Sequence, residues 1–184
     1  MSFPRLITAR LRFQPFTLDD VDALHHLWTD PDVRRYLWDD KIISHETAEE
    51  VVRASLFSFQ EHRFGFWTLR SLENEAIIIG FCGLRFFADL PEIEILYGVT
   101  PEHWGQGLAT EAAKAVLRYG FEELQLPKIW GGADAPNVAS IRVLQKLGMT
   151  YEKTVSMPLG EGPYYSLKRE AFHPGQELYQ LFWT

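Results

Sequence analysis

The spacing of apolar residues near the start of the chain is typical of a strand. In residues 5–16, RLITARLRFQPF, polar residues separate four apolar ones: Leu6, Leu11, Phe13 and Phe16. Alternation of apolar and polar side chains is expected where a strand buries one face. We therefore predict a first strand across this segment.

Two segments with helical spacing come next. In residues 17–30, Thr17 and Asp20 form a capping pattern, and apolar residues recur every three or four positions until the chain reaches Pro31. Residues 44–62 repeat this arrangement, with a serine or threonine cap and an acidic first turn. Both segments are predicted to be helices.

The period then changes to that of a sheet. Three segments rich in β-branched and aromatic residues predict successive antiparallel strands at 64–71, 76–87 and 92–100. Beyond a helix near residue 108, the pattern predicts a strand at 128–134, a helix at 137–148 and a strand pair around 149–157 and 164–170. We expect a single domain, 1–184, of the α+β (mixed α/β) class, with one mixed, mostly antiparallel sheet and helices on both faces.

Two glycines stand where the helix near residue 108 begins. Gly105 and Gly107 flank Gln106, although glycine is a poor helix former. The first amides of a helix lack partners within it, and the positive end of the helix dipole favours an anion. The segment predicts a phosphate-binding loop or, alternatively, a plain turn. It matches neither the P-loop nor the dinucleotide-binding pattern.

Composition limits the classes of function. A formal net charge of −7 argues against a nucleic-acid binder, because phosphate contacts need a basic surface. No apolar run approaches the roughly 18 residues of a membrane span, so we expect a cytoplasmic protein that does not cross a membrane. The lone cysteine, Cys82, agrees with a reducing compartment. The acidic charge would attract a cationic substrate, although many cytosolic proteins are equally acidic.

Several stretches together resemble one known family. IEILYGVTPEHWGQGLATEA, residues 93–112, and NVASIRVLQKLGM, residues 137–149, are similar to the acetyl-CoA-binding motif and the following motif of the GNAT acetyltransferase superfamily. TARLRFQPFTLDD, WTDPDVRRYL and YSLKREAF resemble in particular the branch that contains the ribosomal-protein alanine N-acetyltransferases. The resemblance spans nearly the whole chain.

The resemblance implies where coenzyme A lies. The sheet is expected to splay between its fourth and fifth strands, with the coenzyme in the gap. Backbone amides would hold the pyrophosphate at Trp104, Gly105, Gln106, Gly107, Leu108, Ala109 and Thr110. The strand edge would bond the pantetheine arm and the thioester carbonyl at Leu96, Tyr97, Gly98 and Val99. The sequence departs from the family at Trp104, where glutamine or arginine is common.

The resemblance also implies catalytic groups. Glu94 would relay the proton of the amine through water, although Glu94 and Glu92 could equally just solvate a sheet face. Asn137 and Ser140 would contact the pantetheine and the sulfur region, although Asn137 could be a helix cap. Transfer is expected to be direct, which leaves Cys82 as a core residue.

At the position where the family often places the proton donor to the leaving thiolate, this sequence has a different residue. Leu144 occupies the position where a tyrosine often stands, so Ser140 is the first substitute and Tyr97 the second. The histidines lack the spacing of a zinc site, and no metal is expected. Three tryptophans would fill the core or, as a cluster, line an apolar acceptor pocket: Trp28, Trp38 and Trp67. The resemblance implies that the N-terminal helical region, in or just after which two of them stand, lines the acceptor cleft.

The sequence thus predicts an acetyl-CoA-dependent N-acetyltransferase that acts on a primary amine, either a protein N-terminus or a small molecule. An alternative from another class is a coenzyme A or acyl-CoA sensor without catalysis, which the missing tyrosine motivates. A third is a nucleotide-phosphate binder that uses the same loop. The resemblance makes a monomer or a homodimer the expected assembly.

Overall fold

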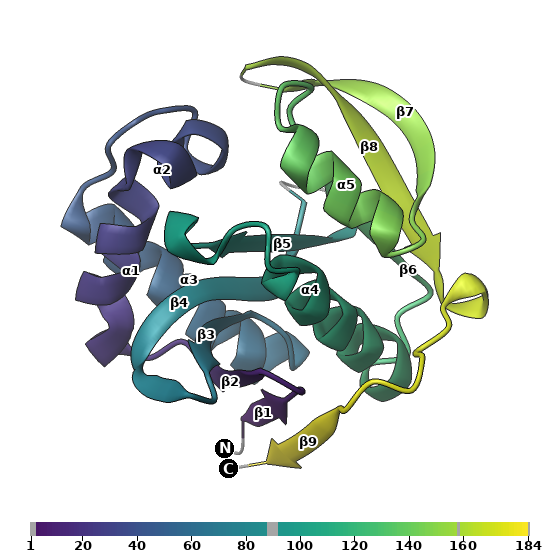
Figure 1. Ribbon diagram of the computed structural model, residues 1–184, viewed down its shortest axis with the longest axis horizontal. Helices are drawn as coiled ribbons and strands as arrows, with labels where there is room; N and C mark the ends of the chain where they lie inside the picture. Colours follow the sequence, from purple (N-terminus) through teal and green to yellow (C-terminus); the bar gives the residue numbers. More distant parts are fainter. Residues whose placement is uncertain (1–2, 88–91, 158, 184) are drawn as a thin grey trace.

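The computed structural model describes residues 3–87, 92–157 and 159–183. Within them nine strands form one sheet in the order β7-β8-β6-β5-β4-β3-β2-β1-β9 (Figure 1). The strands are β1 (Pro4–Ile7), β2 (Leu11–Pro15), β3 (Phe66–Ser71), β4 (Asn74–Phe86), β5 (Ile93–Val99), β6 (Lys128–Gly132), β7 (Thr150–Met157), β8 (Gly160–Lys168) and β9 (Gln180–Trp183). All paired neighbours are antiparallel except β5 and β6. The expected mixed, mostly antiparallel sheet is confirmed.

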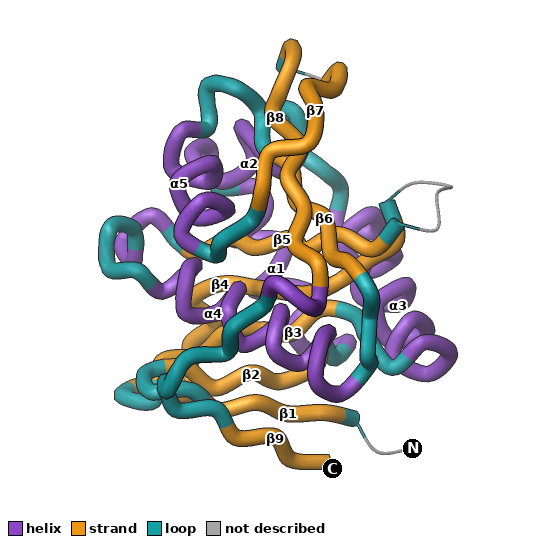
Figure 2. The backbone as a smooth tube through the Cα atoms, turned by 90° about the vertical axis from the view of Figure 1, so that its right-hand side faces the viewer, coloured by secondary structure: helices purple, strands orange, loops and turns teal. Residues whose placement is uncertain are grey.

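Helices lie on both faces of this sheet (Figure 2). They are α1 (Val21–Thr29), α2 (Pro31–Leu37), α3 (His45–His62), α4 (Leu108–Arg118) and α5 (Val138–Lys146). One apolar cluster joins the sheet to α4, and a second joins it to α1 and α3. Because side chains alternate along a strand, Ile95 and Val99 of β5 belong to the first cluster while Leu96 packs against the second. Burial of both faces holds β5 at the centre of the molecule.

The N-terminal segment differs from the prediction of a single strand. Residues 4–15 form a hairpin, in which Leu6 pairs with Phe13. The turn is built by Thr8, whose amide donates to the carbonyl of Leu11 at 2.9 Å and whose hydroxyl accepts from the amide of Leu11 at 3.2 Å. A threonine turn without glycine, proline or asparagine carries little sequence signal. The extra strand also shifts the count of every later strand by one.

Other boundaries differ at three places. A short 3-10 turn, Leu18–Asp20, precedes α1, and the additional helix α2 follows it. Strand β8 begins at Gly160, before the expected start of that strand at residue 164. Strand β9 pairs with β1 and brings the two ends of the chain together (Figure 1). No helix in the described part of the chain is both long and apolar enough to cross a membrane.

Candidate functional site

The sheet opens between β5 and β6. These parallel strands pair only at Glu94 and Trp130, while each continues its ladder with its other neighbour. The predicted splay between the fourth and fifth strands is therefore present, between β5 and β6 once the hairpin is counted. The edge of β5 beyond Glu94 faces the opening.

The register of β5 against β4 decides which backbone groups face this opening. The amide of Thr100 donates to a β4 carbonyl at 2.9 Å. Since bonded and non-bonded positions alternate in an antiparallel pair, Gly98 and Leu96 also direct their backbone groups at β4. The N–H and C=O groups of Tyr97 and Val99 therefore point toward the opening. The strand-edge contact predicted for four residues narrows to these two.

The loop before α4 depends on the two glycines. Gly105 and Gly107 have φ values of 73° and 78°, in the left-handed region that side chains disfavour. A Cβ at Gly105 would meet nothing within 4 Å, and one at Gly107 would meet only Nη2 of Arg10 at 3.8 Å. The space beside this turn is therefore open.

The amides of the turn are free. Within the described residues, the amides from Gly105 to Thr110 donate to no protein acceptor, and the first helical bond runs from Glu111 N to Gly107 O at 3.0 Å. The amide of Trp104 instead donates to Pro101 O at 3.1 Å. Free amides at a helix N-terminus form an anion site. Trp104 drops out of the predicted cradle, which narrows to residues 105–110.

Trp104 has a different contact, which the sequence did not indicate. Its indole Nε1 donates to the carbonyl of Val99 at 2.8 Å, and half of the residue is exposed. The side chain therefore ties the loop to the strand edge. Of the backbone groups at the opening, the carbonyl of Val99 is already bonded.

Three predicted residues meet where β5 faces α5. The hydroxyl of Tyr97 lies 3.0 Å from the hydroxyl of Ser140 and donates to its carbonyl at 3.1 Å. Asn137 caps α5, accepting from the amide of Ser140 at 3.2 Å. Burial raises the pKa of Tyr97, so its phenol keeps its proton. The two candidate proton donors form one hydrogen-bonded pair.

Glu94 lies on the opposite face of the same strand. It is buried; its Oε1 accepts from Nε of Arg85 at 2.7 Å and lies 2.6 Å from Nη2 of the same guanidinium. Burial raises the pKa of the Glu94 carboxyl, and the charge and hydrogen bonds of Arg85 partly offset this. The sequence did not indicate two residues near Glu94, namely Arg85 and the buried Tyr164. The hydroxyl of Tyr164 has no hydrogen-bond partner among the described residues. Both residues lie on strands other than β5, so their place beside this site depends on how the strands pair.

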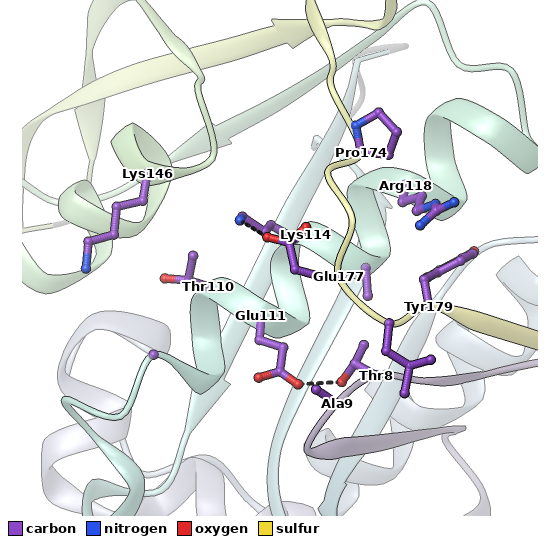
Figure 3. A pocket seen from close by; sticks show the side chains of 13 residues that line it. Thr8, Ala9, Thr110, Glu111, Lys114, Arg118, Lys146, Pro174, Glu177 and Tyr179 are labelled. Carbon is purple, nitrogen blue, oxygen red and sulfur yellow. Dashed lines mark hydrogen bonds and ion pairs between the residues drawn. The ribbon is translucent and has the colours of Figure 1, made fainter.

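A cavity of about 320 Å³ continues from the glycine loop along α4 (Figure 3). Gly107 and Thr110 line its end at the helix start, and Lys114 and Lys146 line its side. Nζ of Lys114 is 2.7 Å from Glu177, which belongs to the segment before β9. The cavity therefore joins the free amides to a lining that carries both basic and acidic side chains.

The remaining candidates belong to the core. Cys82 is buried, and burial raises the pKa of its thiol, which makes it a poor nucleophile. Leu144 is buried against the sheet, and Trp28 and Trp67 are also buried in the two clusters. No group of three metal-ligating side chains was found in the described part of the chain.

Comparison with known proteins shows which family has this fold and this sequence pattern. A family model described as acetyltransferase (GNAT) domain matches residues 10–150. The uncharacterized N-acetyltransferase YoaA of Bacillus subtilis is 32% identical over 151 residues, which cover 82% of this chain and 85% of that relative. The spermidine N(1)-acetyltransferase of Escherichia coli is 25% identical over 142 residues, or 77% of this chain and 74% of that one.

A solved structure supports the fold. The ribosomal alpha-N-protein acetyltransferase RimL, solved in complex with coenzyme A, superposes with a TM-score of 0.76 at 15% identity. The match covers 90% of this chain and 97% of that one. At this identity the likeness shows the fold.

Proposed function

Because this chain belongs to the GNAT acetyltransferase family, we propose that it transfers the acetyl group of acetyl-CoA directly to a primary amine. The observation that supports this most is the free amide turn beside an opened sheet edge. The family and the named relatives make it an N-acetyltransferase, which argues against a sensor without catalysis. Cys82 is buried, so direct transfer is favoured over an acyl-enzyme.

Three parts of the chain would hold acetyl-CoA. The amides of residues 105–110 suit the diphosphate, since these free donors face an open space at a helix N-terminus. The backbone groups of Tyr97 and the amide of Val99 suit the amide-bearing pantetheine arm, since the carbonyl of Val99 already accepts from Trp104. The cavity along α4, which continues from these amides, is the space proposed for the nucleotide end. Acetyl-CoA supplies an activated thioester, and the protein supplies position and proton transfer.

Glu94 is the proposed base. An amine attacks only when neutral, so a group must take its proton. Burial raises the pKa of Glu94, which makes its carboxylate a stronger base, and the charge and hydrogen bond of Arg85 partly offset this rise. The proton would pass to Glu94 through water.

Tyr97 and Ser140 are the proposed proton donors to the departing thiolate. Both hydroxyls lie in one hydrogen-bonded pair on the face of β5 opposite Glu94. This places the donor and the base on either side of the strand that borders the opening. The pair replaces the tyrosine whose usual position is occupied by Leu144.

The acceptor we propose is a cationic small amine, of which spermidine is the first probe. The net charge of −7 attracts cations, and Glu92 stands two positions before the buried Glu94, at the entrance to β5. The spermidine N(1)-acetyltransferase among the relatives supports this class. A protein N-terminus is the competing acceptor, favoured by the fold similarity to RimL.

A thiol-release assay tests the proposal. Acetyl-CoA is supplied with a panel of polyamines, amino acids, aminoglycosides and peptides with free N-termini. We expect thiol release above background with spermidine. Release only with peptides would replace the proposed acceptor, and no release with any amine would overturn catalysis of amine acetylation.

A further inference from the structure

Arg10 lies across the turn that carries the free amides. It belongs to the turn between β1 and β2, and its Nη1 donates to the carbonyl of Gln106 at 2.9 Å. Its Nε and Nη2 each lie 2.7 Å from Oε2 of Glu111. The guanidinium therefore joins the N-terminal hairpin to both the loop and the first turn of α4.

Glu111 is held by the same hairpin turn on its other oxygen. Oε1 accepts from the hydroxyl of Thr8 at 2.7 Å (Figure 3) and from the amide of Arg10 at 3.0 Å. A carboxylate in the first turn stabilises a helix through its dipole. Here, however, the carboxylate also stands beside amides that suit an anion. Without a cation at this place, the negative charge would repel a diphosphate.

We infer that Arg10 is a positioning residue for the diphosphate of acetyl-CoA. It neutralises Glu111 and fixes the carbonyl of Gln106, so that the amide face of the turn presents a net positive field to the ligand. The contacts of Arg10 with both groups are charge-assisted and hold the guanidinium in one place. The inference rests on the proposed function, because it requires a diphosphate at this turn.

Calorimetric titration with coenzyme A tests the role of Arg10. Arg10→Met should weaken binding about tenfold, since it leaves the negative charge of Glu111 unopposed beside the diphosphate. Glu111→Gln should bind somewhat more tightly than the parent, because the positive charge of Arg10 is then no longer offset. The double variant should regain the affinity of the parent within about threefold. Arg10→Lys keeps the positive charge, so its affinity for coenzyme A should fall less than that of Arg10→Met.

The recovery in the double variant separates neutralisation from a purely structural role. A structural role predicts that the double variant binds as weakly as Arg10→Met, and that result would overturn the inference. So would an unchanged dissociation constant in Arg10→Met. Arg53→Met is the matched control, because Arg53 pairs with Glu49 at 2.6 Å on α3, and it should bind coenzyme A like the parent. Failure of the parent protein to bind coenzyme A would instead count against the proposed function.

Discussion

Glu94 and Tyr97 are three residues apart on β5, and their side chains point to opposite faces of the sheet. Burial raises the pKa of both groups. For a carboxyl this means a stronger base, whereas for a phenol it means a weaker acid that stays protonated. The shift therefore suits Glu94 to the role of base, while the role proposed for Tyr97 rests on its hydrogen-bonded pair with Ser140.

The pH dependence of kcat/KM tests the role of Glu94. A base must be ionised, so activity should rise with pH through the raised pKa of Glu94. Arg85 stabilises the carboxylate, and Arg85→Met should raise that pKa further and move the acidic limb to higher pH. Glu94→Gln should remove this limb and lower kcat/KM by about 10²- to 10⁴-fold.

The Arg53–Glu49 pair on α3 again supplies the control. Arg53→Met and Glu49→Gln remove the same groups from an exposed ion pair and should leave the profile unchanged. An acidic limb that survives in Glu94→Gln would assign the base to another group.

Kinetics of Tyr97→Phe and Ser140→Ala test the proposed proton donor. Each variant should lower kcat more than it raises KM, because the hydrogen-bonded pair acts at the chemical step. The double variant should be no slower than the slower single variant, since both changes disable one unit. Tyr151→Phe, at an exposed tyrosine of β7, should be neutral. Additive losses would contradict a shared role.

At the residue scale, the sequence predicted the site residues that lie within recognisable motifs, but it did not predict their partners elsewhere in the chain. Asn137 and Ser140 stand at the start of a helix whose capping pattern is local, so their meeting was predictable. Arg10 and Glu111 are separated by 101 positions along the chain, and Arg85 meets Glu94 only through the pairing of two strands. Such partners depend on register and topology, which a single sequence does not determine.

At the scale of elements, the first turn of α4 carries the proposed site. Gly107 and Gly148 are matched glycines, with φ values of 78° and 76°, each next to a helix and free of close neighbours. Only Gly107 borders the free amides. The pair therefore allows backbone strain to be separated from ligand binding.

Substitution of these two glycines tests the turn. Gly107→Ala and Gly148→Ala should each lower the free energy of unfolding by about 1 kcal/mol, because alanine disfavours the left-handed region. Gly107→Glu should in addition abolish detectable binding of coenzyme A, since it places a negative charge at the phosphate position. Gly148→Glu should bind normally. Equal affinities in the two glutamate variants, measured by calorimetry, would refute the placement.

The elements divide by how local their signals are. Periodicity and caps correctly predicted α3, where Ser44 accepts from the amide of Thr47 at 3.1 Å. Helix α2 could have been predicted from its sequence, because Asp30 is a cap residue and Pro31 follows it in the first turn. Strand β9 has no such local pattern, since its conformation depends on pairing with β1 at the other end of the chain.

At the scale of the molecule, the sheet consists of two parts that meet at one residue pair. β9 and β1 to β5 form one part, and β6, β7 and β8 form the other. Only the family resemblance predicted the splay, because no pattern of hydrophobic residues indicates where two neighbouring strands lack hydrogen bonds. A ligand seated in the opening would bind both parts and stabilise the native state.

Thermal unfolding tests this linkage. Acetyl-CoA at about one hundred times its dissociation constant should add about 2.7 kcal/mol to the free energy of unfolding, which raises Tm by roughly 5 to 10 °C. Gly107→Glu should show no such rise under the same conditions. A rise of equal size in that variant would mean that the ligand binds elsewhere.

A crystal structure of the protein with acetyl-CoA tests the central claim most directly. We predict that the diphosphate accepts hydrogen bonds from the amides of residues 105–110 and that the pantetheine arm lies between β5 and β6 along Tyr97 and Val99. A diphosphate bound away from that turn, or an arm that does not enter the opening between the two strands, would contradict it.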